Sequence, residues 1–174
     1  ILGSDEETVA AVCEKTSGYV VPVNFNSPAQ TVVAGEKDAV AAVSETFAGM
    51  GKKAVPLAVA AAFHSKLMQP AADEFYEGAK AFAFKEPEVD FYSNLSGEKL
   101  TDFSDMPARL ARHIVSPVLF TKELAAMQAA GADAFFECGP GKVLTGLVKK
   151  TLKGVTALNV EDAKTLDKAL EAAG

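Results

Sequence analysis

Apolar residues in the first 60 positions recur at two spacings, one typical of strands and the other of helices. The turn sequence Asn26-Ser27-Pro28 separates two β-rich segments and predicts a hairpin. The resulting order, β-α-β-β-α-β, is that of a ferredoxin-like unit. The predicted elements are strands at about 1–2, 19–25, 31–34 and 53–57 and helices at about 5–16 and 36–50.

Beyond residue 60 the pattern predicts strands that alternate with helices through short connections. This arrangement is typical of a parallel sheet with helices on its faces, so the fold class is α/β. The apolar run 55–63 is too short to span a bilayer. We interpret it as a buried strand that leads into a turn. The remaining predicted elements are helices at about 65–81, 106–114, 117–130, 142–151 and 161–172 and strands at about 89–92, 134–138 and 155–159.

The charge balance and the cysteines narrow the classes of protein. The net charge is −6 and no cluster of lysine and arginine interrupts it, which argues against a nucleic-acid partner. Cys13 and Cys138 match no metal-ligand spacing, and we interpret them as reduced, half-buried thiols of an intracellular protein without a signal peptide. The opening Ile1-Leu2-Gly3 has no methionine, and we interpret the chain as a fragment that begins within a strand.

Only two histidines are present, and they predict different roles. His64 lies between the apolar run and a helix, where the helix dipole favours a neutral imidazole that can accept a proton. The alternative for His64 is a structural or helix-capping side chain. His113 lies late in a predicted helix, and its side chain suits a simple charge–dipole contact. The run Gly139-Pro140-Gly141 is too short for a Walker loop and predicts a tight strand-to-helix turn.

Four motifs in a fixed order carry a resemblance to a known family. They are Val23-Asn24-Phe25-Asn26-Ser27-Pro28 with Gln30; Ala61-Ala62-Phe63-His64-Ser65 with Leu67-Met68 and Pro70-Ala71-Ala72; Ser116-Pro117-Val118 with Phe120-Thr121; and Glu137-Cys138-Gly139-Pro140-Gly141-Lys142-Val143-Leu144-Thr145-Gly146-Leu147. Together they resemble the malonyl-CoA:acyl-carrier-protein transacylases of fatty-acid synthesis and the acyltransferase domains of polyketide synthases. The resemblance extends over most of the chain, to about residue 150.

The resemblance implies a ferredoxin-like subdomain at 1–60, its first strand truncated, and the C-terminal part of an α/β-hydrolase-like subdomain with parallel strands at 61–174. The implied reaction is a ping-pong malonyl transfer from CoA through a serine to the phosphopantetheine thiol of acyl carrier protein. His64 would activate the serine and then the thiol, oriented by the main-chain carbonyl of His113. Phe63, which favours malonyl over methylmalonyl groups, and Asn24 and Asn26 would contact the substrate.

The family's Gly-x-Ser-x-Gly elbow is absent from this sequence. We therefore expect the chain alone to be inactive, and its partners to be malonyl-CoA, acyl carrier protein and a missing N-terminal part of the same enzyme. No metal and no bound cofactor are expected, because CoA thioester and phosphopantetheine enter as substrates. The expected compartment is the cytoplasm, or a plastid or mitochondrion in a eukaryote. Two alternatives are a non-catalytic module that binds acyl carrier protein and a freestanding ferredoxin-like regulatory domain.

Overall fold

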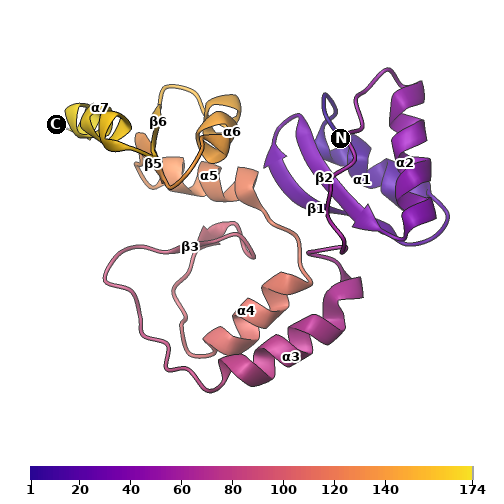
Figure 1. Cartoon of the computed structure of the whole chain (residues 1–174), viewed down its shortest axis with the longest axis horizontal. Helices are drawn as coiled ribbons and strands as arrows, with labels where there is room; N and C mark the ends of the chain where they lie inside the picture. The colour runs from indigo at the N-terminus through magenta and orange to yellow at the C-terminus, as the bar shows by residue number, and fades with distance from the viewer. Residues whose placement is uncertain (174) are drawn as a thin grey trace. The chain divides into compact units, whose positions relative to one another are not determined.

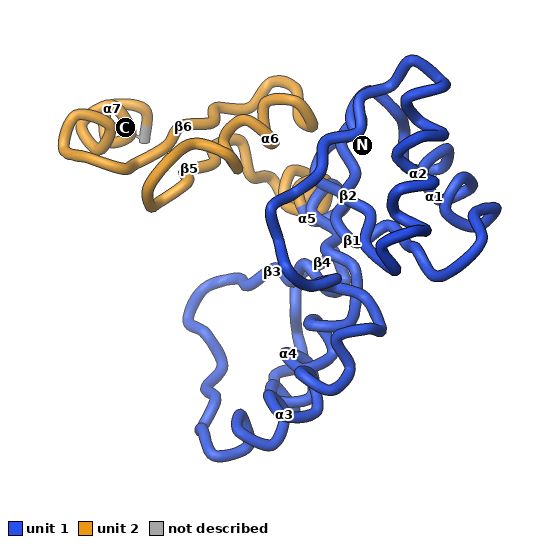
Figure 2. Tube along the Cα trace, turned by 45° about the vertical axis from the view of Figure 1, so that its right-hand side comes forward, with its two compact units in different colours: residues 1–123 blue, residues 124–174 orange. Residues whose placement is uncertain are grey.

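The computed structural model describes residues 1–173 and divides into two compact units (Figure 2). The first unit comprises residues 1–123 and the second begins at Leu124. The boundary between the two units lies after residue 123, whereas the family resemblance places the subdomain boundary at residue 60. The latter boundary stays a prediction. The two-strand parallel sheet and its helices confirm the α/β class. Among residues 1–173, no helix combines the length and the apolar character needed to cross a membrane.

The N-terminal segment of the first unit is a β-hairpin packed with two helices (Figure 1). Helix α1 (Glu6–Lys15) begins after Asp5, whose side chain accepts a hydrogen bond from the Thr8 N–H at 2.8 Å. Strands β1 (Val20–Ser27) and β2 (Gln30–Gly35) are antiparallel, and helix α2 (Lys37–Gly49) follows. These four predicted elements are confirmed. Their apolar faces form a core of Val9, Cys13, Val20, Ala39, Val43 and Phe47.

The predicted strand at 53–57 and the buried run at 55–63 are wrong. Lys53 makes a single bridge to Leu2, and Leu2 also bridges Gln30, but residues 54–57 do not form a strand. Leu57 and Val59 are 57% and 60% exposed. The run is apolar enough to be buried, but within the described residues no strand pairs with it. Hydrophobicity alone therefore indicated burial without indicating what would cover the segment.

Two helices and a short hairpin follow in the first unit. The 3₁₀ turn η1 (Lys66–Met68) leads into α3 (Gln69–Ala79), which packs beside α4 (Met106–Ile114) (Figure 1). In the sequence between these two helices, β3 (Tyr92–Ser93) pairs with β4 (Glu98–Lys99). The predicted strand at 89–92 is therefore almost entirely wrong, since only Tyr92 is in a strand and Val89 is 76% exposed.

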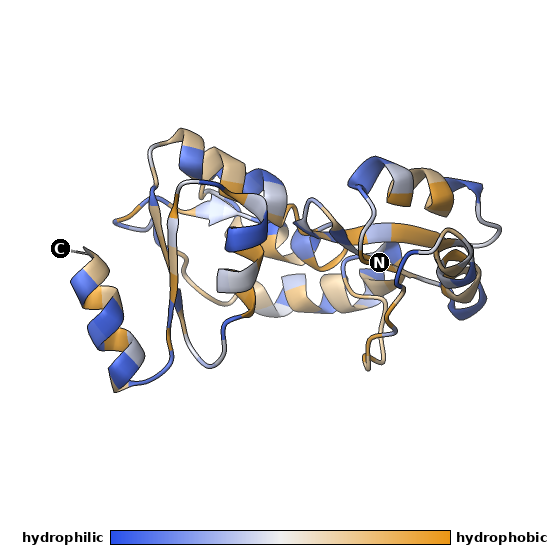
Figure 3. Cartoon of the chain, turned by 90° about the horizontal axis from the view of Figure 1, so that it is seen from above, coloured by the Kyte–Doolittle hydropathy of each residue, from blue (hydrophilic) through white to orange (hydrophobic). Residues whose placement is uncertain are grey.

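The second unit contains the parallel strands. Helix α5 (Phe120–Ala129) begins in the first unit and leads into β5 (Ala134–Cys138), α6 (Val143–Thr151), β6 (Thr156–Val160) and α7 (Ala163–Ala173). The register pairs Ala134 with Thr156 and continues to Cys138 with Val160, in parallel. Hydrophilic and hydrophobic residues alternate along α7, next to the C label in Figure 3, as expected of an amphipathic helix.

Candidate active site

His64 occupies a strained turn between the apolar run and η1. Its φ is 61°, and it is the one non-glycine residue with a positive φ in the described part of the chain. An L-residue pays about 1–2 kcal/mol for this left-handed conformation. The prediction that His64 lies in the first turn of a helix is wrong, because Ser65 is the N-cap of η1 and its side chain accepts a hydrogen bond from the Leu67 N–H. The helix therefore begins after the histidine.

The ring and the backbone of His64 both contact the end of α4. His64 Nδ1 lies 2.9 Å from the main-chain oxygen of His113, and the His64 N–H donates to the Ile114 carbonyl at 3.0 Å. The last carbonyls of a helix lack partners within the helix, so they are free to accept both bonds. A carbonyl only accepts, so Nδ1 carries the ring proton when the imidazole is neutral. Nε2 then keeps a lone pair that can accept a proton.

The His113 side chain lies next to the His64 ring but makes no hydrogen bond to it. The two ring centroids are 5.1 Å apart, and the planes are tilted by 40°. His113 Nε2 is buried and has no hydrogen-bond partner among the residues that the structure describes. Burial lowers the pKa of His113, and the neighbouring His64 lowers it further. The expected charge–dipole contact at the helix end is therefore disfavoured, because burial opposes the cationic form.

The turn after His64 is held from the hairpin segment as well as from its own residues. Ser65 Oγ donates to the Ala62 carbonyl at 2.7 Å. The Lys66 N–H donates to the Tyr19 hydroxyl at 3.2 Å, and Lys66 Nζ lies 4.1 Å from the centre of the Tyr19 ring. The sequence carries no signal for this contact, since 47 residues separate Tyr19 from Lys66.

The first and third motifs meet at β1. Asn24 bridges Val118 in parallel, the Phe25 N–H donates to the Val118 carbonyl at 2.9 Å, and the Val118 N–H donates to the Val23 carbonyl at 2.8 Å. The register shifts between Phe25 and Ser27, which leaves Asn26 as the extra residue of a bulge. Both asparagines are half-buried, whereas Phe63 is 51% exposed. Their contacts with substrate stay predictions.

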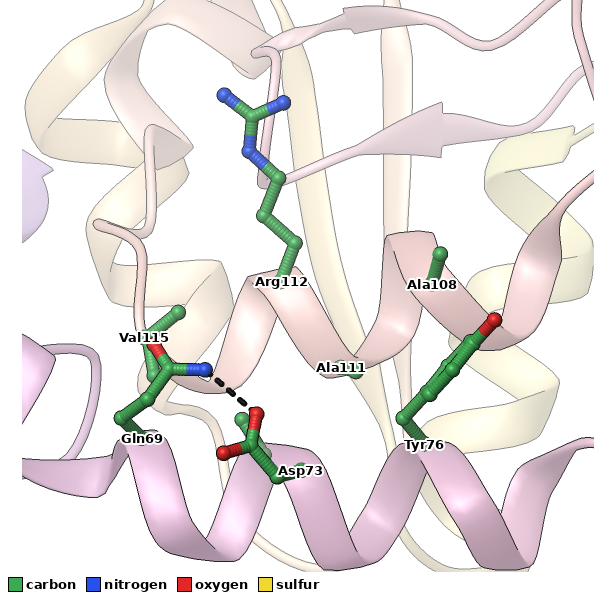
Figure 4. A pocket seen from close by; sticks show the side chains of 8 residues that line it. Gln69, Asp73, Tyr76, Ala108, Ala111, Arg112 and Val115 are labelled. Atoms are coloured by element: carbon green, nitrogen blue, oxygen red, sulfur yellow. Dashed lines mark hydrogen bonds between the residues drawn. The ribbon is translucent and has the colours of Figure 1, made fainter.

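A separate pocket lies between α3 and α4 and has a volume of about 310 Å³ (Figure 4). Gln69 Nε2 donates to Asp73 Oδ1 across its wall at 2.7 Å, and Arg112 and Tyr76 supply its other polar groups. Its lining does not include His64 or Phe63. We therefore assign the histidine pair, and not this pocket, as the candidate active site.

The fourth motif forms the predicted tight turn from β5 into α6. Gly139 and Gly141 have φ values of 138° and 92°, which L side chains rarely adopt. Glu137 caps α6, because its carboxylate accepts from the Leu144 N–H at 3.0 Å and from the Thr145 N–H and hydroxyl at 2.7 Å each. Burial acts to raise the pKa of Glu137, but these hydrogen bonds outweigh it and the pKa is lowered.

The cysteines are free thiols in different surroundings. Cys13 is buried in the hairpin core, and burial raises its pKa to about 11. Cys138 is exposed at the end of β5, so neither thiol is half-buried as predicted. Within the described residues, no three His, Cys, Asp or Glu side chains gather closely enough to hold a metal ion.

Comparison with known proteins confirms the family resemblance. The family model described as "Acyl transferase domain" matches residues 3–169. A malonyl CoA-acyl carrier protein transacylase from Salmonella typhimurium is 38% identical over 173 residues, which cover 98% of this chain and 56% of that protein. The chain thus spans about half the length of the curated relatives it matches.

Two solved structures extend the likeness to three dimensions. The malonyl CoA-acyl carrier protein transacylase of Clostridium perfringens is 37% identical, with a TM-score of 0.94 over 99% of this chain and 55% of that one. A malonyl-transacylase in complex with a type II PKS acyl-carrier protein is 35% identical, with a TM-score of 0.93 over 99% of this chain and 57% of that one. The chain belongs to the acyl transferase domain family, within which it is similar to the malonyl CoA-acyl carrier protein transacylases.

Proposed function

We propose that this chain is the histidine-bearing part of an enzyme that transfers malonyl groups from malonyl-CoA to the phosphopantetheine thiol of acyl carrier protein. The observation that carries the proposal is the 2.9 Å contact between His64 Nδ1 and the His113 carbonyl. This contact leaves Nε2 available as a general base, which is the task of the histidine in a Ser–His pair. The names of the relatives supply the substrate class.

In the proposed reaction, His64 acts twice. Its Nε2 takes the proton from a serine hydroxyl while the serine oxygen attacks the malonyl thioester, and the imidazolium then protonates the departing CoA thiolate. In the second half, Nε2 takes the proton from the phosphopantetheine thiol, whose sulfur attacks the malonyl-serine ester. The serine is regenerated when the imidazolium returns its proton. Since no Gly-x-Ser-x-Gly occurs in this sequence, the serine comes from another segment.

We propose that the serine-bearing segment covers the apolar run 55–63. This run is continuous with His64 and exposes Val55, Leu57, Val59 and Phe63. Four large apolar side chains in nine residues are unusual on a free surface and typical of an interface. The uncovered part of the relatives, a little under half their length, is large enough to supply that cover. Val59→Asp is expected to leave the chain's own stability within about 0.5 kcal/mol while preventing assembly.

The test is to co-express this chain with the segment of the Salmonella typhimurium relative that it does not cover, and to measure malonyl transfer to holo acyl carrier protein. We expect activity in the assembled protein and none in the chain alone. His64→Ala should lower kcat by about 10²–10⁴-fold. The matched control is His113→Gln, which keeps the carbonyl and should stay within a few-fold of the parent.

Two results would overturn the proposal. An effect of His64→Ala below tenfold would remove this residue as the base. Binding of acyl carrier protein with no transfer, under conditions in which the complete Salmonella typhimurium protein is active, would favour a non-catalytic binding module.

A further inference from the structure

We infer that Tyr19 is a positioning residue for His64, acting through Lys66. The inference rests on the proposed function, since it assigns a means of holding the same imidazole. Tyr19 is half-buried at the start of the hairpin, and its side chain contacts Lys66 through both the hydroxyl and the ring. Lys66 is two residues beyond His64, so a restraint on its backbone also restrains the histidine.

The backbone of Tyr19 is itself fixed from both sides. Its N–H donates to Glu36 Oε2 at 2.9 Å, and its carbonyl accepts from the Glu36 N–H at 2.7 Å. A Cβ on Gly35 would lie 2.0 Å from the Tyr19 carbonyl oxygen, so this close approach requires glycine at position 35. Gly18 precedes Tyr19 and has a φ of 88°. A Cβ added at Gly18 would lie 2.9 Å from Glu36 Oε2. Tyr19 is therefore a well-anchored point from which to hold another segment.

The segment that Tyr19 holds needs external restraint. A strained conformation such as that of His64 persists only where surrounding contacts fix it. The first N–H groups of η1 have no partner within the helix. The Leu67 N–H donates to Ser65 Oγ, and the Lys66 N–H donates to the Tyr19 hydroxyl. The ammonium of Lys66 over the Tyr19 ring adds a cation–π contact. Tyr19 thus completes the cap of η1 and connects the His64 turn to the hairpin.

The test begins with the 174-residue chain, Tyr19→Phe and the control Tyr92→Phe, which removes a hydroxyl elsewhere in the same unit. Hydrogen exchange measured by NMR should show the Lys66 amide exchanging about three- to tenfold faster in Tyr19→Phe, which is the loss of one ordinary hydrogen bond. The urea midpoint should fall by no more than this one hydrogen bond accounts for, and amides outside the Tyr19–Lys66 contact that exchange by local opening should keep the parent rate. Lys66 exchange at the parent rate would overturn the inference.

The second measurement uses the enzyme assembled with the serine-bearing segment. Tyr19→Phe should lower kcat by about two- to tenfold with the KM for malonyl-CoA unchanged, and Tyr92→Phe should change neither. If His64→Ala abolishes transfer while Tyr19→Phe keeps the parent kcat, the positioning role fails and the proposed function stands. If His64→Ala is active, the proposed function itself fails, whatever the exchange of Lys66 shows.

Discussion

The left-handed backbone of His64 predicts an unusual order of stability between two variants. His64→Ala and His64→Gly both remove the imidazole and its bond to the His113 carbonyl, so the difference between them reports on the backbone alone. Alanine keeps a Cβ and its strain of about 1–2 kcal/mol at a φ of 61°. Glycine has no strain there but loses about 0.5–1 kcal/mol more backbone entropy on folding. We expect His64→Gly to be more stable by about 0.5–1 kcal/mol.

Tyrosine fluorescence is a suitable probe for this comparison. The chain has no tryptophan, and its three tyrosines, Tyr19, Tyr76 and Tyr92, all lie in the first unit with His64. Their fluorescence during urea unfolding therefore follows that unit alone. With a slope of about 2 kcal/mol per molar urea, the midpoints should differ by about 0.3–0.5 M.

A nearby residue on the N-terminal side of His64 provides a control of opposite sign. Ala62 has no positive φ, so Ala62→Gly should lower the urea midpoint in the usual way. If His64→Ala proved as stable as His64→Gly, or more so, His64 would not be held in the left-handed conformation. The account of a strained histidine fixed by its surroundings would then be refuted.

Three further variants test the core, the histidine pair and the predicted specificity residue Phe63. Phe47→Ala, in the hairpin core at 0% exposure, should cost about 3–5 kcal/mol in urea unfolding, whereas Phe82→Ala, at 72% exposure, should change it by less than about 0.5 kcal/mol; similar losses would contradict the assigned core. His113 has a pKa lowered by burial, so the folded state resists protonation and loses stability as the pH falls from about 6.5 through the lowered value. The urea midpoint should therefore fall less between pH 7.5 and pH 5.5 in His113→Gln than in the parent. An equal fall in both proteins would contradict this prediction. Phe63→Ser, in the assembled enzyme, should raise the ratio of methylmalonyl to malonyl transfer, and an unchanged ratio would remove Phe63 from the specificity argument.

The elements with strong local signals could be predicted from the sequence nearly to the residue. Helix α4 begins after Asp105, which caps it, with Pro107 in its first turn, and it was predicted at the same bounds. Strand β5 was likewise predicted at its observed bounds, because a short β-rich run ends there at a Gly-Pro-Gly turn. In both cases residues within the element or beside it determine the boundary.

The features that were missed depend on residues far apart in the chain. The apolar run 55–63 has the composition of a buried strand, but periodicity cannot specify a partner strand, and no strand of residues 1–173 pairs with it. The positive φ of His64 accompanies contacts with α4, some 50 residues away. Histidine has no preference for a positive φ strong enough to predict it from the sequence. The Tyr19–Lys66 contact depends on tertiary packing in the same way. The role of the His113 carbonyl came from the family resemblance, and the structure supplies the geometry on which that role depends.

The central claim is that His64 presents an unprotonated Nε2 because the His113 carbonyl holds the proton on Nδ1. Long-range ¹H–¹⁵N NMR of the 174-residue chain at about pH 8 tests it most directly, since the ring nitrogens report the tautomer and only two histidines contribute signals. The account predicts a His64 ring with a protonated Nδ1 and an unprotonated Nε2. A ring protonated at Nε2, or one that averages between the two tautomers as free imidazole does, would contradict it.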